Sequence, residues 1–251
     1  MNFINKIKRL FKHIYVMPAN NVSRIKFLFA WEYGFLRFVY FFITKKLRTY
    51  NEIDNATGIG GAKYSKKAFY DGKIPVYRPN ERVMWPIFFL NSIPLINKND
   101  LLVIGPRYET EILIAKSFGF RNIVGLDTYS YSPLIEMGDM HNMRFEDNSF
   151  NNVICASTLT YSDNPKLAAK EMIRVMRKNA IVVIMVHAVS TYKDFDKSRG
   201  IEGQNYDKDR PDTKENLDKL FDGLEKVHFI EVDETNGSGG AILIAAYKKI
   251  N

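Results

Sequence analysis

From residue 100 onward the chain alternates short apolar runs with helical patterns, and this alternation constrains the fold more than any other feature. The apolar runs are Leu101–Ile104, Asn122–Asp127, Asn152–Ser157 and Ile181–Val186. Short, nearly continuous apolar runs are typical of parallel strands that are buried on both faces. Strands that alternate with helices in this way predict a three-layer α/β sheet.

Helix signals stand in two of the three gaps between these four apolar runs. A helical stretch ends near residue 117, where Gly119 is well placed as a C-terminal cap. A second helix opens at Pro165, with Asp163 or Asn164 as its N-cap. These positions predict that the helices cross between successive strands of one sheet.

The C-terminal part of the chain predicts one more helix and a closing hairpin. Residues 190–212 are polar and read as a long loop, after which Asp212 and Glu215 have capping-box spacing. Val227–Val232 and Ala241–Tyr247 flank a glycine-rich turn, as two antiparallel strands do. We therefore expect a Rossmann-like sheet over residues 98–251, mostly parallel, with a C-terminal antiparallel hairpin.

The net charge of +8 is concentrated in the first fifth of the chain. Residues 1–50 hold ten basic residues and one acidic residue, a balance of +9, whereas the remaining 201 residues hold 26 basic and 27 acidic, a balance of −1. The same fifty residues contain 13 of the 34 aromatic side chains. A basic and aromatic segment favours an anionic membrane surface over nucleic acid.

This basic arm, residues 1–50, reads as helical. Residues 1–14 have amphipathic spacing, and a second helix is predicted from a cap at Ser23 to about Arg48. Glu32 and Arg37 interrupt its apolar stretch, so we expect neither a membrane-spanning helix nor a signal peptide. The prediction is a cytoplasmic protein that docks peripherally on a membrane through residues 1–48, with nucleic acid disfavoured as a partner.

Residues 51–97 are rich in turn formers and read as a connecting or lid segment. The glycines around residues 58–61 lack a preceding strand and a following Lys-Ser/Thr, so they predict a flexible loop and no phosphate site. The single cysteine, Cys155, allows no disulfide within the chain and fits a reducing compartment. The four histidines have no metal-ligand spacing, so no metal site is expected.

Polar residues that follow the predicted strands are the candidate site. In an open parallel sheet, ligands bind outside the carboxyl ends of the strands. Gly105 follows the first strand and permits a tight turn. Asp127 ends the second, 22 residues further on, where nucleotide-binding sheets place the carboxylate that accepts hydrogen bonds from ribose. Asp139 stands before a turn and could reach an adenine amino group.

The sequence over residues 101–111, 122–127, 138–159 and 164–186 resembles the class I S-adenosylmethionine-dependent methyltransferases, and within them the small-molecule "type 11" branch. The resemblance covers about residues 98–187. It implies S-adenosylmethionine as the cofactor and a small-molecule, glycan or lipid acceptor.

The resemblance also assigns parts of the cofactor to particular residues. It places the ribose at Asp127 and the adenine at Asp139 with Met140. It places the methionine end beside Ser157 to Leu159. The full set of implied cofactor-binding residues is Gly105, Pro106, Arg107, Glu109, Asp127, Thr128, Asp139, Met140, Ser157 and Leu159.

The cofactor loop departs from the family pattern of an acid followed by three alternating glycines. Val103 stands at the acid position, and Arg107 and Glu109 stand at the later glycine positions. The loop resembles a Gly-Pro-Arg variant that is followed by Ser-Tyr-Ser-Pro and Tyr-Ser-Asp segments, which this chain has at 130–133 and 161–163. In that reading Arg107 reaches the cofactor carboxylate and Glu109 its amino group. The alternative is that Arg107 and Glu109 only form an ion pair with each other.

Candidates for catalysis are few. His187 follows the last parallel strand and could act as a general base, because an ordinary histidine titrates near pH 6.5. His141 and Tyr161 are further candidates, although single residues of this kind are more often structural. The main alternative function is a non-catalytic scaffold or binding protein with the same fold. A nicotinamide-dependent oxidoreductase is disfavoured because Gly105 lacks two partner glycines.

Overall fold

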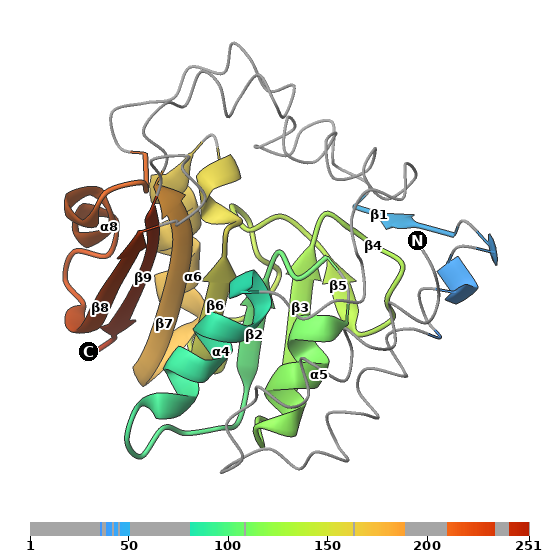
Figure 1. The fold of residues 1–251 in the computed structure, drawn as a ribbon, viewed down its shortest axis with the longest axis horizontal. Helices are drawn as coiled ribbons and strands as arrows, with labels where there is room; N and C mark the ends of the chain where they lie inside the picture. The colour runs from blue at the N-terminus through green and yellow to red at the C-terminus, as the bar shows by residue number, and fades with distance from the viewer. Residues whose placement is uncertain are drawn as a thin grey trace.

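A seven-stranded sheet forms the centre of the protein in the computed structural model (Figure 1). The structure describes residues 36, 39–41, 43, 44, 46–50, 81–107, 109–162, 164–188, 210–233 and 241–250. The strands of the sheet are β2 (Leu101–Ile104), β3 (Ile123–Asp127), β5 (Ile135–Met137), β6 (Phe150–Ala156), β7 (Met176–Ala188), β8 (Glu225–Asp233) and β9 (Ala241–Lys248). Their order is β5-β3-β2-β6-β7-β9-β8, in which β9 pairs antiparallel with β7 and β8 and the other neighbouring strands pair parallel. The predicted fold is confirmed, and the hairpin of β8 and β9 joins the sheet through β9.

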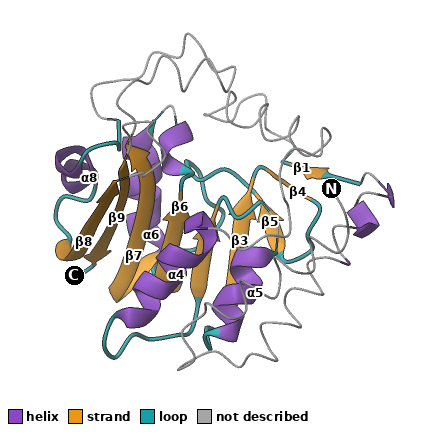
Figure 2. Ribbon diagram, in the orientation of Figure 1, coloured by secondary structure: helices purple, strands orange, loops and turns teal. Residues whose placement is uncertain are grey.

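Helices cover both faces of this sheet (Figure 2). The helices and short elements are α4 (Glu81–Ser92), α5 (Thr110–Ser117), η1 (Leu159–Tyr161), α6 (Pro165–Val175) and α8 (Lys214–Leu220), with a separate two-stranded pair of β1 (Arg48–Thr49) and β4 (Tyr129–Ser130). Helices α4 and α5 lie on one face, and α6 and α8 lie on the other (Figure 1). Among the described helices, none is long and apolar enough to cross a membrane.

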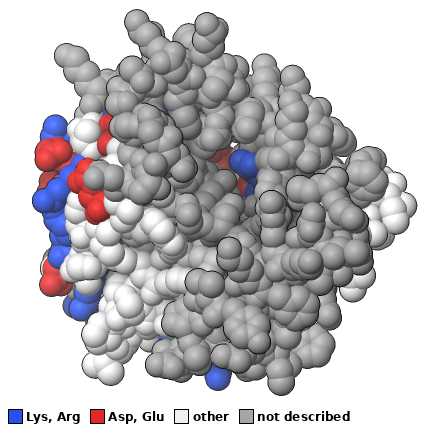
Figure 3. Space-filling view, viewed as in Figure 1, with Lys and Arg blue, Asp and Glu red and all other residues white. Residues whose placement is uncertain are grey.

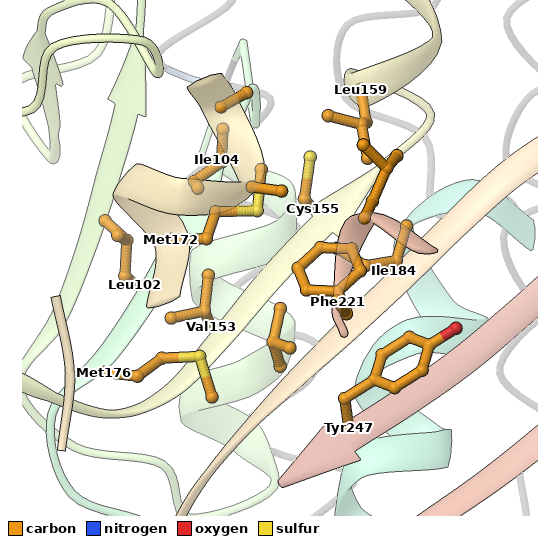
Figure 4. Close-up of a cluster of buried hydrophobic side chains, with 14 of the residues drawn as sticks. Leu102, Ile104, Val153, Cys155, Leu159, Met172, Met176, Ile184, Phe221 and Tyr247 are labelled. Atoms are coloured by element: carbon orange, nitrogen blue, oxygen red, sulfur yellow. The ribbon is translucent and has the colours of Figure 1, made fainter. Parts of the chain in front are cut away.

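The pleat of the central strands divides the core between the two helical layers. Leu101 and Val103 of β2 belong to the cluster that packs under α4 and α5. Leu102 and Ile104 belong to the cluster with α6 and α8, where Met172 and Phe221 lie (Figure 4). Successive strand residues point to opposite faces, so a strand covered on both sides must be apolar throughout. This explains why the predicted strands read as continuous apolar runs.

The predicted caps of the first two crossover helices are confirmed. Gly119 has φ +89°, its N–H donates to the carbonyl of Lys116, and the N–H of Phe120 donates to the carbonyl of Ala115. This pair of bonds closes α5 with a left-handed residue that glycine adopts without strain. At the start of α6, the Asn164 side chain accepts a hydrogen bond of 3.1 Å from the N–H three residues on. Asn164 is therefore the N-cap of α6.

Several boundaries differ from the sequence prediction, and those of α8 and β7 matter for the site. Helix α8 begins one residue later than expected, because Thr213, and not Asp212, accepts the capping hydrogen bond from the N–H of Asn216. Strand β7 begins at Met176, directly after α6, and it extends to Ala188. His187 is therefore inside β7, paired with β9, and not in the loop beyond it.

The segment expected to be a connection or lid contains a helix that the sequence did not predict. In α4, Ile87 and Leu90 are 1% and 0% exposed, and both pack into the core cluster beside α5. The sequence pattern gave no helical period here, because Pro86 lies inside the helix and residues 87–90 are all apolar. The division of the chain into three segments stays a prediction, but residues 81–92 pack as part of the core.

The predicted second helix of the basic arm ends before Arg48. Residues 36, 39–41, 43 and 44 are helical, whereas Arg48 and Thr49 form β1. The amphipathic helix expected over residues 1–14, the glycine loop at 58–61, residues 190–209 of the long loop and the glycine-rich turn at 236–240 lie outside the described residues.

Charged side chains of both signs mix on the surface near β8 and α8 (Figure 3). Lys226 of β8 forms an ion pair with Asp218 of α8, and Asp218 also accepts a hydrogen bond of 3.0 Å from the Tyr247 hydroxyl. Burial, together with Asp218, raises the pKa of Tyr247. This mixed surface agrees with the balanced charge counted for the chain beyond residue 50.

Candidate cofactor site

The carboxyl ends of the central parallel strands lie level with one another. Ile104, the last residue of β2, is in register with Leu126 of β3 and with Cys155 of β6. Residues that follow these strands therefore meet at one edge of the sheet. This is the edge at which open α/β sheets bind their ligands.

Asp127 at the end of β3 is fixed by the backbone of two loops. Its Oδ2 accepts a hydrogen bond of 2.8 Å from the N–H of Arg107, in the loop after β2. Its Oδ1 accepts bonds from the N–H of Tyr129, at 3.2 Å, and more weakly from the Thr128 hydroxyl, at 3.4 Å. These contacts orient the carboxylate group at the end of β3.

Gly105 occupies a position where no side chain fits. Its φ is +71°, and a Cβ on it would lie 2.0 Å from the Oγ1 of Thr158. The Thr158 hydroxyl is directed to the carbonyl of Ala156, at 3.2 Å. The resemblance implies that this glycine belongs to the cofactor loop, and the structure shows that the side chain of Thr158 also requires it.

The rest of the loop after β2 places its polar residues at the start of α5. Arg107 has φ +59°, a left-handed conformation that is uncommon for residues other than glycine, and its carbonyl accepts a 2.8 Å bond from the Ser130 hydroxyl. Glu109 is 1% exposed and takes the N-cap position of α5 without a side-chain capping bond. Pro106 is buried between this loop and β3. The chain therefore buries an acidic side chain at a helix N-terminus, where the helix dipole favours negative charge.

The loop after β6 contains two buried hydroxyl groups. Ser157 has φ +55° and is 6% exposed, and its Oγ has no hydrogen-bond partner among the described residues. Thr160 Oγ1, three residues on in η1, is also buried and has none there. Left-handed non-glycine residues and unsatisfied buried polar groups are concentrated at ligand sites. Thr160 was not singled out from the sequence, because nothing in the sequence marks a hydroxyl as unsatisfied.

Leu159 does not offer its side chain to this edge. It is 0% exposed and packs in the core with Cys155 and Phe221 (Figure 4). Any contact of Leu159 with a ligand would therefore come from its backbone. The cysteine beside it is buried, as predicted from its apolar surroundings.

The residues around Asp139 form a compact turn after β5. Asp139 and His141 are buried, with 8% and 5% exposed, and Met140 packs at the margin of the core. His187 and Tyr161 are half-buried. No group of three or more His, Cys, Asp and Glu side chains within the described ranges could hold a metal ion.

Helix α6 braces the segment that follows Asp139. Arg174 donates to Glu171 and Asp147, at 2.8 and 2.7 Å, and to the carbonyls of Phe145 and Met143, at 2.8 and 2.9 Å. Glu171 in turn accepts from the N–H of Met143, at 2.9 Å. The hydrogen bonds from Arg174 hold the pKa of the Glu171 carboxyl below its ordinary value. The segment is thus attached to a rigid helix by a charged network.

Replacing Glu171 by glutamine is expected to lower stability at neutral pH by about 1–2 kcal/mol, because the charge-assisted bonds to Arg174 are lost. A lowered folded-state pKa stabilises the protein above the unfolded-state pKa of about 4.3, and the gain disappears as pH falls through the folded-state value. Urea unfolding at pH 7 and pH 3 should therefore show a gap between wild type and E171Q that closes in acid. Glu225→Gln, at an exposed position of β8, is the matched control. An equal gap at both pH values would contradict the ion-pair explanation.

The end of the basic arm contacts the loop that follows Asp127 through Phe41, Arg48 and Tyr50. Phe41 is 1% exposed and stacks on Tyr131 with ring centroids 5.1 Å apart. The N–H of Tyr50 donates to the carbonyl of Thr128, at 3.0 Å. Arg48 donates to the carbonyls of residues 132 and 135. The end of the basic arm therefore supports the candidate site.

Comparison with known proteins agrees with this geometry. A family model described as a methyltransferase domain matches residues 109–184. No curated protein matches the chain in a sequence search.

Solved structures share the fold at low sequence identity. A phosphoethanolamine N-methyltransferase 2 from Haemonchus contortus, in complex with phosphomonomethylethanolamine and S-adenosylhomocysteine, has a TM-score of 0.52 and 13% identity, covering 66% of this chain and 52% of that one. A geranyl diphosphate methyltransferase in complex with its substrate and sinefungin has a TM-score of 0.51 and 11% identity, over 66% and 76% of the two chains. The [4+2]-cyclase SpnF has a TM-score of 0.51 and 13% identity, over 65% and 79%. These structures show that the chain has the Rossmann-like methyltransferase fold, and the family model places a methyltransferase-domain match over the part of the chain that carries the carboxyl-edge site.

Proposed function

We propose that this protein transfers the methyl group of S-adenosylmethionine, bound across the carboxyl ends of β2, β3, β5 and β6, to a small-molecule acceptor. The observation that carries the proposal is the Asp127 carboxylate, which the backbone N–H groups of Arg107 and Tyr129 hold at the end of β3. A carboxylate fixed at this point is suited to accept hydrogen bonds from two ribose hydroxyls.

The residues present fit the remaining parts of this cofactor. Asp139 with Met140 would hold the adenine. Arg107 and Glu109 would meet the carboxylate and the amino group of the methionine end, with Ser157 beside them. The buried, unsatisfied hydroxyl of Ser157 supports this assignment, because burying a hydroxyl without a partner costs about 1–3 kcal/mol that a ligand can offset.

Methyl transfer from this cofactor does not require covalent catalysis by the protein. When bound, S-adenosylmethionine supplies a methyl group that its sulfonium charge has already activated. The side chains at the edge of the sheet have to hold the acceptor in line with that group and exclude water. For an oxygen acceptor we assign the proton to His187, near the carboxyl end of β7, with Tyr161 as the alternative.

The similarity in structure to two methyltransferases with small-molecule substrates supports a small acceptor. The two methyltransferases of similar structure are named for geranyl diphosphate and for phosphoethanolamine. A glycan or lipid acceptor, docking of the arm on an anionic membrane and a cytoplasmic location stay predictions from the sequence.

A non-catalytic binding protein is the second candidate, and one observation favours it. The loop after β2 has Arg107 and Glu109 where methyltransferases of this branch have glycines. The cyclase of similar structure illustrates that the fold alone does not require methyl transfer.

Binding of S-adenosylhomocysteine, measured by isothermal titration calorimetry, tests the proposal. We expect a Kd of about 1–100 µM, which corresponds to about 5–8 kcal/mol. NADH at the same concentrations is the control and should give no heat. The absence of binding at about 1 mM cofactor would refute the proposed function. Binding without transfer of a labelled methyl group to any member of a broad acceptor panel would favour the non-catalytic candidate.

A further inference from the structure

The connection from β3 to β5, residues 128–134, holds two parts of the proposed cofactor site. The N–H of Tyr129 donates to the Asp127 carboxylate at 3.2 Å, and the Ser130 hydroxyl donates to the carbonyl of Arg107 at 2.8 Å. Tyr129 and Ser130 are 4% and 0% exposed. A shift of this connection would therefore move both the carboxylate that ends β3 and the loop after β2.

The same two residues of the connection pair with the arm end, which consists of Phe41 and residues 46–50. Strand β1 of the arm end is antiparallel to β4, with Arg48 opposite Ser130 and Thr49 opposite Tyr129 (Figure 1). The connection thus contacts the site on one side and the arm end on the other.

Side chains of the arm end cover the rest of the connection. Phe41 stacks on Tyr131 with ring centroids 5.1 Å apart, and the two residues are 1% and 6% exposed. The Arg48 guanidinium donates to the carbonyl of Ser132 and, at 2.6 Å, to that of Ile135, the first residue of β5. Release of the arm end would expose both rings to water, so the position of the connection depends on the arm end.

The arm end can open while the core stays folded. Strand β1 has two residues, it lies outside the seven-stranded sheet, and the side chains of Lys46 and Arg48 are exposed. A separate two-stranded pair of this length is marginally stable in water. Such segments open locally at a much lower free energy than the whole domain. The arm end therefore has two states, docked and open, whose balance a ligand can change.

We propose that Phe41 and Arg48 are positioning residues for the cofactor site, and that docking of the arm end and binding of the cofactor are linked. The inference rests on the proposed function, since it needs the cofactor to lie beside Asp127 and Arg107. In the docked state the connection holds these groups in place before the ligand arrives. In the open state the ligand has to order them, so it binds more weakly. By reciprocity, the ligand must favour the docked state by the same factor.

Amide hydrogen exchange of residues 46–50 in wild type, with and without saturating S-adenosylhomocysteine, measures this factor. The N–H of Tyr50 donates to the carbonyl of Thr128 in the docked state, at 3.0 Å, so it exchanges when the arm end opens. We expect the ligand to slow this exchange about 5- to 50-fold, within the usual range of coupling between two sites. A local opening that is not linked to the site would keep its rate.

Calorimetry of a variant with a released arm end measures the same factor independently. The double variant Phe41→Ala, Arg48→Ala removes the stacked ring and the guanidinium, so its residues 46–50 should exchange as an open segment. Its Kd for S-adenosylhomocysteine should rise by the factor by which the ligand slows exchange in wild type. Arg48→Lys should keep part of the affinity, because an ammonium can still donate to one of the two carbonyls. A merely structural role would not make the two factors agree.

Two control variants separate linkage from a general loss of stability. Phe88→Ala removes a comparable aromatic contact, the edge-to-face pair with Phe118 at 5.0 Å, which lies between α4 and the end of α5. Arg121→Ala removes an exposed arginine side chain. Both should leave the Kd unchanged at a temperature where circular dichroism shows the variant to be folded.

The contrary outcomes are distinct from one another. If wild type does not bind S-adenosylhomocysteine, the proposed function fails and this inference fails with it. If the ligand binds but leaves the exchange of residues 46–50 unchanged, the proposed function stands and the positioning role is refuted. A rise in Kd for Phe88→Ala as large as that for the double variant would also refute it. The exchange measurement uses wild type alone, so it decides the question even if the double variant does not fold.

Discussion

Gly105→Ala is expected to destabilise the protein by about 2–4 kcal/mol, because two separate penalties add. The first is conformational, since Gly105 has φ +71° and alanine in that region costs about 1 kcal/mol. The second is steric. The new Cβ would lie 2.0 Å from Thr158 Oγ1 and 2.6 Å from its Cγ2, and overpacking a buried site costs about 1–3 kcal/mol.

A second glycine separates these penalties experimentally. Gly223 has φ +85°, but a Cβ on it would meet nothing within 4 Å. Gly223→Ala should therefore carry only the conformational cost of about 1 kcal/mol. Urea unfolding of both variants, with wild type beside them, measures the difference. Equal losses for the two variants would contradict the overlap with Thr158.

Shortening Thr158 should rescue Gly105→Ala in steps. Thr158→Ala removes Oγ1 and Cγ2 but keeps a Cβ at 2.7 Å, so we expect partial recovery. Thr158→Gly removes every overlapping side-chain atom, so in that background Gly105→Ala should cost no more than Gly223→Ala does. The coupling energy of this double-mutant cycle is the energy of the contact between the two loops. A cycle with no coupling would show that the glycine is required by its φ alone.

The strands and the caps of α5 and α6 could be predicted because their determinants are local. Leu101–Ile104 is apolar at every position, and Gly119 and Asn164 stand beside the helices they cap. The start of α8 was misplaced by one residue for a related reason. Asp212 and Thr213 are both good N-caps, and only the folded backbone decides between them.

Asp127 and Gly105 could be predicted as site residues because the carboxyl ends of parallel strands meet at one edge. The contacts that surround these two residues could not be predicted. The contact of Thr158 with Gly105 spans 53 positions of the sequence, and Arg48 reaches the carbonyl of Ser132 over 84. His141 was a candidate base from its type alone, and nothing in the sequence shows that it lies buried between Asp139 and Ser162. Such pairings depend on tertiary packing, which no local pattern encodes.

Asp127→Asn is expected to weaken binding of S-adenosylhomocysteine about 100- to 1,000-fold. The proposed ribose contacts lose the charge that strengthens them, at about 1.5–3 kcal/mol for such hydrogen bonds. The amide also has one acceptor oxygen where the carboxylate has two. Because Arg107 and Tyr129 donate to different oxygens, one of their N–H groups would face the Nδ2 of the new asparagine. The loop after β2 or the loop after β3 would then shift.

Calorimetry at a temperature where circular dichroism shows the variant to be folded separates binding from stability. The cost in stability should be about 1–3 kcal/mol, the penalty of leaving one partly buried donor unpaired. Asp222→Asn, at an exposed position after α8, makes the same change of charge away from the site and should alter neither quantity.

Deoxyribose analogues of the ligand show whether the lost affinity belongs to the ribose. In wild type, removal of the 2′- or the 3′-hydroxyl from S-adenosylhomocysteine should weaken binding about 10-fold or more. In Asp127→Asn both analogues should bind nearly as well as the parent ligand, because the group that distinguishes them has gone. If the variant binds the parent ligand within threefold of wild type, Asp127 acts only as a clamp between two loops, and the ribose has to be placed elsewhere on this edge of the sheet.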